Sequence, residues 1–109
     1  MAHKTSTDQV RELYESSADS YDKMMDGEID HPLYTDTLGR LSTRIADLPG
    51  PVIDTSCGSG HMLELFHTRY DADRELLGIE LSTRMTQIAT ARLQPAAATV
   101  MTGDMRDLR

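Results

Sequence analysis

The sequence contains 109 residues, of which 39% are hydrophobic and 27% are charged, which predicts one folded globular unit rather than a disordered chain. The formal net charge of -7 argues against nucleic acid or an anionic membrane as a partner, because both require clustered Lys and Arg. We therefore expect a small-molecule ligand. The N-terminus lacks the apolar core of a signal peptide, and no apolar run approaches membrane-spanning length, so we expect a cytoplasmic protein.

Residues 1–50 predict two helices. Ser6 followed by Gln9 is typical of a helix start, and Gly27 is expected to end this helix after Met25. Its apolar side chains recur at the helical period and are expected to form one inward face: Val10, Leu13, Tyr14, Ala18, Tyr21, Met24 and Met25. The second helix is expected to begin near Pro32 and to run to Leu48, where the Pro-Gly-Pro sequence stops it. We expect these helices to form an N-terminal cap.

Residues 51–109 alternate between strand and helix patterns. Apolar runs at 52–53, 76–79 and 98–101 predict strands, and helical periodicity separates them. This alternation predicts an α/β fold with a parallel sheet of about three strands. The handedness of strand–helix–strand units places the first strand beside the second, with the third beyond it, as in half of a doubly wound Rossmann-like sheet.

The segment from Pro51 to Gly60 joins a short strand to a helix through a glycine-containing turn. Gly58 and Gly60 lack a Cβ, which allows a tight turn and close approach of the backbone to a ligand. The helix that follows points free N–H groups at the turn. The next strand ends in Glu80, and an acidic residue at that place typically holds the hydroxyl groups of a ribose. The pattern therefore predicts an adenosine-type cofactor.

A dinucleotide fingerprint does not fit this turn. Reading G-x-G-x-x-G from Gly58 requires glycine where the chain has Leu63, and reading it from position 56 requires glycine at Ser56 and His61. A nicotinamide-dependent oxidoreductase is therefore the less favoured interpretation.

The turn instead resembles motif I of the class I methyltransferases that use S-adenosylmethionine. Asp54, Cys57, Gly58 and Gly60 stand in register with that motif, while Ser56 replaces its first glycine. Residues 78–82 and 102–108 resemble the second and third cofactor segments of the same family. The resemblance implies the N-terminal, cofactor-binding portion of a methyltransferase, with further strands expected beyond this chain.

The resemblance also implies roles for individual residues. Backbone groups of the turn would line the methionine end of the cofactor, Asp54 would hold its ammonium group, and Glu80 would accept from both ribose hydroxyls. Asp104 would accept from the adenine amino group. A tyrosine hydroxyl of the first helix, Tyr21 or Tyr14, would meet the methionine carboxylate. The cofactor-binding residues implied are Tyr21, Asp54, Ser56, Cys57, Gly58, Gly60, Glu80, Leu81, Asp104 and Met105.

Simpler interpretations exist for several of these residues. Asp54 and Asp104 are also ordinary at strand ends and turns, and Tyr14 and Tyr21 also suit plain packing of an amphipathic helix. Cys57, the only cysteine, is either a small buried side chain or a thiol made reactive by the helix N-terminus, and we expect the former. The histidine spacing does not match a metal-binding pair, so we expect no metal site.

Methyl transfer from a sulfonium mainly requires alignment of the acceptor and exclusion of water. The sequence assigns no catalytic residue and leaves amine, hydroxyl, thiol and carbon acceptors open. We expect transfer to a small molecule. The alternative is a non-catalytic module that binds the cofactor or its product, or acts only in an interaction.

The outer edge of the first strand is expected to lack a pairing strand. Val52 and Ile53 would then lie at an open, apolar edge, which favours pairing with another chain. We therefore expect marginal stability and self-association through this edge.

Overall fold

The structure is a computed structural model that describes residues 6–104. Its seven elements follow the predicted order: α1 (Ser6–Glu28), α2 (Pro32–Ile45), β1 (Val52–Asp54), α3 (His61–Arg69), β2 (Leu76–Glu80), α4 (Thr83–Arg92) and β3 (Ala98–Thr102). The strands are parallel in the order β1-β2-β3. The predicted α/β fold is therefore confirmed. The division into a cap and a core stays a prediction.

Two helix ends differ from the prediction. The first helix continues past Gly27 to Glu28, since one glycine costs a helix only about 1 kcal/mol and a Cβ at Gly27 would meet nothing within 4 Å. The second helix ends at Ile45, before Leu48. Its end is held by Arg74, whose guanidinium donates to the carbonyl groups of Ile45, Leu48 and Gly50. These bonds give a donor to carbonyl groups at and just after the helix end.

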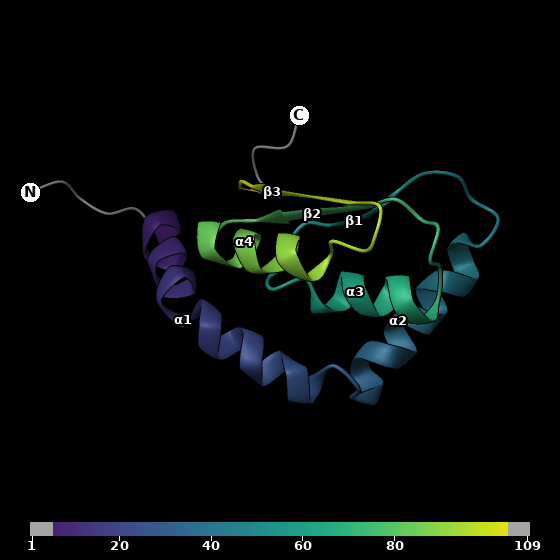
Figure 1. The fold of residues 1–109 in the computed structure, drawn as a ribbon, viewed down its shortest axis with the longest axis horizontal. Coiled ribbons are helices and arrows are strands. Elements are labelled where there is room, and N and C mark those ends of the chain that lie inside the picture. The colour runs from purple at the N-terminus through teal and green to yellow at the C-terminus, as the bar shows by residue number, and fades with distance from the viewer. Residues whose placement is uncertain (1–5, 105–109) are drawn as a thin grey trace, which may run out of the picture.

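The two crossover helices, α3 and α4, cover one face of the sheet (Figure 1). Close packing there depends on Gly78 of β2, because a Cβ at that position would lie 2.9 Å from the Sγ of Cys57. The buried core consists of Leu38, Cys57, Leu63, Leu65, Phe66, Leu76, Ala89 and Leu93. The apolar residues of the predicted strands and crossover helices thus supply most of the core.

The other face of the sheet is more exposed. Ile53 of β1 is 53% exposed and Met101 of β3 is 50% exposed. Within the described residues, β1 pairs only with β2, and a cavity of about 240 Å³ beside β1 is lined by side chains of α2 and α3. The predicted open edge is therefore present in the part of the chain described. Self-association through it stays a prediction.

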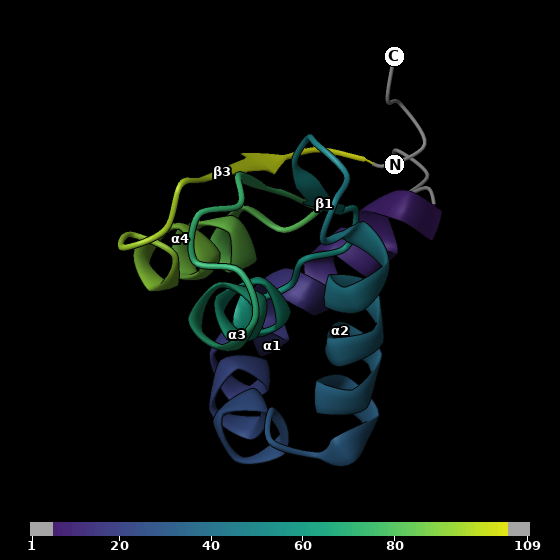
Figure 2. The ribbon, with the colours of Figure 1, turned by 90° about the vertical axis from the view of Figure 1, so that its right-hand side faces the viewer.

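The N-terminal helices lie beside different helices of the core (Figure 2). α2 contributes Leu38 to the core and lies beside α3. α1 runs beside α4, and its first turns reach the carboxyl ends of the strands (Figure 1). The predicted inward face of α1 is only partly correct: Ala18 and Met25 are buried, but Leu13 is 62% exposed and Met24 is 52% exposed. No helix among residues 6–104 combines the length and apolarity that crossing a membrane requires.

Candidate functional site

A cleft lies between α1 and the carboxyl ends of the three strands. It consists of two cavities of about 320 and 240 Å³ that share Tyr14, Ser56 and Glu80 in their walls. The remaining wall of the larger cavity is formed by Ser6, Thr7, Val10, Thr55, Leu81, Gly103 and Asp104. That of the smaller is formed by Leu13, Ser17, Tyr21, Gly58 and Met85. The carboxyl edge of a parallel sheet is where α/β proteins bind their ligands.

The glycine turn after β1 is held by local hydrogen bonds. Asp54 Oδ1 accepts from the Ser56 N–H at 3.0 Å, and the Gly60 N–H donates to the Cys57 carbonyl at 2.9 Å. Gly58 and Gly60 have φ values of 54° and 85°, where L side chains are strained. Within residues 6–104, positive φ occurs only at glycine. Ser56 therefore replaces the motif's first glycine without requiring an unfavourable backbone conformation.

Gly58 and Gly60 each allow the close approach of a different helix. A Cβ at Gly58 would lie 3.2 Å from the Tyr21 ring, so this glycine lets α1 approach the cleft. A Cβ at Gly60 would lie 3.1 Å from the Cβ of Ala89, so this one lets α4 pack against the turn. Each glycine thus serves a close contact as well as a backbone conformation.

Cys57 faces the core beneath the turn. Its side chain is 6% exposed, and its N–H donates to the Ile79 carbonyl at 3.1 Å. Burial, together with the nearby Asp54 and Glu80 carboxylates, raises the pKa of the thiol to about 12. A thiol in this state is a packing group, which confirms the buried interpretation over the reactive one.

Glu80 brings a buried carboxylate to the cleft. It is 3% exposed, and its Oε2 accepts from the Leu81 N–H at 2.8 Å. Burial raises its pKa, the Leu81 N–H opposes that rise, and the Asp54 carboxylate adds to it. An ionised carboxylate has capacity for several further donors. Ligand hydroxyl groups would supply such donors and favour the charged form.

The cleft gathers most of the predicted cofactor residues. Those that line it are Tyr21, Ser56, Gly58, Glu80, Leu81 and Asp104. Asp54 lines the cavity beside β1 instead, and its carboxylate turns back to the Ser56 N–H. Cys57 and Gly60 face the core and α4, and Met105 lies outside the described residues.

Both candidate tyrosines of α1 border the cleft, together with residues that the sequence did not assign. Tyr14 lines both cavities, whereas Tyr21 lines only the smaller one. Partial burial raises the Tyr21 pKa, and nearby Tyr34 and Glu80 raise it further, so its hydroxyl stays a donor. Val10 and Leu13 also reach the cleft. Their helical spacing was visible in the sequence, but it did not show that this face borders a ligand cavity.

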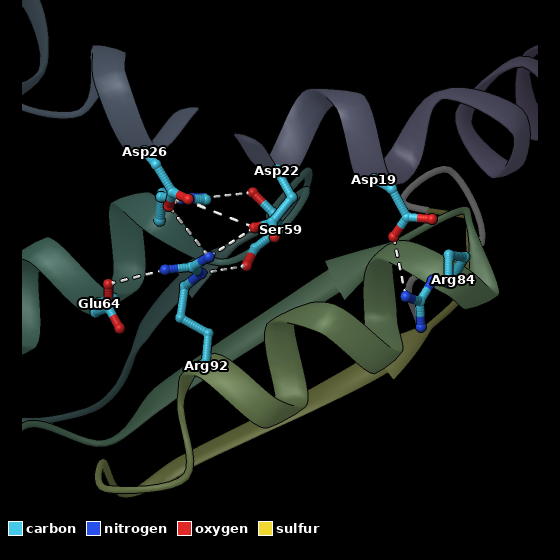
Figure 3. Close-up of polar contacts among 8 residues, drawn as sticks. Asp19, Asp22, Asp26, Ser59, Glu64, Arg84 and Arg92 are labelled. Carbon is cyan, nitrogen blue, oxygen red and sulfur yellow. Dashed lines mark hydrogen bonds and ion pairs between the residues drawn. The ribbon is translucent and has the colours of Figure 1, made fainter. Parts of the chain in front are cut away.

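Behind the turn, an acidic and basic cluster joins α1 to α3 and α4 (Figure 3). Asp22, Asp26 and His61 offer ligand atoms within 4.8 Å of one another, as a metal site would require. The Arg92 guanidinium, however, lies 2.6 Å from Asp22 and 3.5 Å from Asp26. It pairs with both carboxylates and offsets one of their two negative charges.

A comparison with protein families matches a family model described as a methyltransferase domain over residues 52–109. A search of curated proteins finds no match. The family match begins at β1 and includes the glycine turn, Glu80 and Asp104, the features that define the cleft in the structure. Since it covers more than half of the chain, the protein belongs to this methyltransferase family, whose members use S-adenosylmethionine.

Proposed function

We propose that the cleft under α1 binds S-adenosylmethionine for methyl transfer to a small molecule. In this arrangement Glu80 accepts from the ribose hydroxyls, Leu81 and Asp104 border the adenine, and Ser56 and Gly58 border the methionine end. The observation that carries the proposal is the buried Glu80 carboxylate, which lies in the cleft wall between the glycine turn and Asp104. A carboxylate placed there offers charge-assisted hydrogen bonds to paired hydroxyl groups.

The bound cofactor supplies an already activated methyl group, so the protein's task is positioning and exclusion of water. The turn fixes the methionine end through backbone groups, and α1 forms a roof with Tyr14 and Tyr21. No residue of the described chain is assigned as a catalytic base.

The charge of the cleft supports a small neutral or cationic acceptor. The walls of its two cavities contain Glu80 and Asp104 but no Lys or Arg among the described residues. The whole chain has a net charge of -7. Both features disfavour a polyanion such as nucleic acid.

Calorimetry with S-adenosylmethionine and S-adenosylhomocysteine tests the site. We expect Glu80→Gln to weaken binding by about 1–3 kcal/mol, the scale of hydrogen bonds to a charged group. Glu75→Gln is the matched control, because Glu75 is exposed just before the amino end of the same strand. Binding that is tight in the wild type and unchanged in Glu80→Gln would remove the ribose assignment.

The pH dependence of binding sharpens this test. The raised pKa means that free Glu80 holds its proton to higher pH than an ordinary glutamate. Because ribose hydroxyls favour the carboxylate, affinity should increase as pH rises through that pKa and then level off. Glu80→Gln should abolish this rise. An equal rise in the variant would assign the titration to another group.

Transfer of a labelled methyl group to a panel of small amines, alcohols and thiols tests the second half of the proposal. Product formation identifies the acceptor class. Tight cofactor binding without transfer to any small acceptor would favour the non-catalytic alternative.

A further inference from the structure

Ser59, in the middle of the glycine turn, is held by two side chains from neighbouring helices. Its carbonyl accepts a hydrogen bond from Arg92 Nε at 3.2 Å, and its hydroxyl lies 2.5 Å from His61 Nδ1. Ser59 is only 1% exposed. Two polar groups of this buried residue are therefore satisfied by the last residue of α4 and the first residue of α3.

Both side chains also bind carboxylates of α1. His61 Nε2 lies 2.8 Å from Asp26 Oδ1, and Arg92 binds Asp22 at 2.6 Å (Figure 3). A carboxylate only accepts hydrogen bonds, so Nε2 donates to Asp26, while Nδ1 shares a hydrogen bond with the Ser59 hydroxyl. Two chains of contacts thus connect the turn to the helix that roofs the cleft.

Arg92 has a further contact that fixes its orientation. Its Nη1 donates to Glu64 of α3 at 3.3 Å, while its side chain is 18% exposed. Three groups from α1, the turn and α3 therefore meet one planar guanidinium. The fork of donors in arginine suits this geometry, and a lysine ammonium does not reproduce it.

We propose that Arg92 is a positioning residue for the methionine end of the cofactor. Arg92 does not line the cleft cavities; it holds the Ser59 carbonyl and thereby orients the backbone between Gly58 and Gly60. This inference rests on the proposed function, which places the methionine end at that turn. It predicts a defect confined to the part of the ligand that the turn contacts.

Comparing the affinities for two ligands distinguishes a positioning role of Arg92 from a general effect on stability. S-adenosylhomocysteine carries the amino acid, whereas 5′-methylthioadenosine has the adenosine and thioether without it. We expect Arg92→Met to weaken S-adenosylhomocysteine binding about tenfold, the scale of one charge-assisted hydrogen bond, and 5′-methylthioadenosine binding less than about twofold. Calorimetry with the full chain measures both affinities.

Arg84→Met is the matched control. Arg84 also joins α4 to α1, through Asp19 at 2.9 Å (Figure 3). Among the described residues its side chain otherwise donates only to Gln87. The Arg84→Met variant should leave the ratio of the affinities for S-adenosylhomocysteine and 5′-methylthioadenosine unchanged. Arg92→Lys keeps the positive charge but lacks the planar set of donors, so it should restore the ratio of the two affinities only in part. It also serves as the test variant if Arg92→Met does not fold.

Hydrogen exchange without ligand gives an independent readout. The Gly60 N–H donates to the Cys57 carbonyl, so its exchange reports the turn's own geometry. Faster exchange in Arg92→Met and Arg92→Lys than in Arg84→Met is the expected result.

Three results would overturn the positioning role. They are an equal loss of affinity for both ligands, full restoration by Arg92→Lys, or unchanged turn exchange in both Arg92 variants. A wild type that binds both ligands equally tightly, while its turn exchange depends on Arg92 as expected, contradicts the placement of the methionine end in the proposed function instead.

Discussion

The two N-terminal helices are held by different forces. α2 is attached through apolar packing, with Leu38 buried in the core and Tyr34, Leu41 and Ile45 packed against it. α1 buries only Ala18 and Met25, and its polar attachment comes from acidic side chains at positions 15, 19, 22 and 26, which bind α3 and α4. The four acidic positions are spaced by four, three and four residues, so they form one stripe along the helix.

This difference gives the two helices different roles: α2 belongs to the stable core, and α1 covers the cleft. Apolar burial is insensitive to salt and contributes to global stability, whereas exposed ion pairs are weak and screened. α2 should therefore unfold only with the whole domain, while α1 can detach at lower free energy. A roof held partly by ion pairs is suited to admit and release a ligand.

The largest effect is expected at the core contact of α2. Leu38 is 6% exposed, so Leu38→Ala should lower the free energy of unfolding by about 2–5 kcal/mol through lost burial and a new cavity. Leu13→Ala on α1, where the side chain is 62% exposed, should change it by less than about 0.5 kcal/mol. Urea denaturation measures both. Similar losses would show that the two helices contribute equally to the core.

A smaller effect is expected at the end of α2. The guanidinium of Arg74 donates to three carbonyl groups and binds Asp71 at 3.0 Å, and its side chain is 11% exposed. Arg74→Met should cost about 1–3 kcal/mol, because three carbonyl groups, among them the partly buried one of Ile45, lose their donor. Arg69→Met removes an exposed pair with Asp30 and should cost at most about 1 kcal/mol. A larger loss of stability in Arg69→Met than in Arg74→Met, measured by thermal or urea unfolding, would contradict the role of Arg74 at the end of α2.

Salt should distinguish the helices directly. Raising ionic strength from about 0.01 to about 1 M shortens the Debye length from about 30 to about 3 Å. The free energy of opening of α1, measured by hydrogen exchange, should fall by about 1 kcal/mol, the sum of several weak pairs. Exchange in α2 should not change. An equal response of both helices would show that the acidic stripe does not hold α1.

The smallest expected effect is the loss of protection of α1 at acidic pH. The hydrogen bond with His61 is the main cause that lowers the pKa of Asp26 from its ordinary value of 3.8. A carboxylate with a lowered pKa contributes fully above the ordinary value and loses its contribution as pH falls through the lowered one. Protection of α1, corrected for intrinsic exchange, should therefore begin to fall below about pH 4.

Asp26→Asn is the control for this titration. It should weaken α1 at neutral pH and remove part of the acid response. An unchanged acid profile in Asp26→Asn would assign the response to the other acidic residues of the stripe.

Most of the fold could be predicted because its signals are local. Apolar runs bounded by Pro and Gly mark the strands, and the turn with Glu80 marks the ligand edge. The direction of Asp54 could not be predicted, because a strand-end aspartate does not show that its carboxylate returns to the Ser56 N–H.

The attachment of α1 could not be predicted either. Its acidic spacing is visible in the sequence, but its partners are not, since Arg92 follows Asp22 by 70 residues. Periodicity indicated one apolar inward face, whereas in the structure only Ala18 and Met25 of that face are buried and acidic side chains share the contact with α3 and α4. Leu13 and Met24 stay exposed.

The buried thiol of Cys57 has a practical consequence for following α1 in solution. Its raised pKa of about 12 keeps this thiol protonated at pH 7, and its side chain is buried. Alkylating dyes should therefore not react with Cys57. Leu13→Cys would place an ordinary thiol on exposed α1 and accept a single fluorophore. The wild-type background thus allows site-specific labelling without prior removal of a native cysteine.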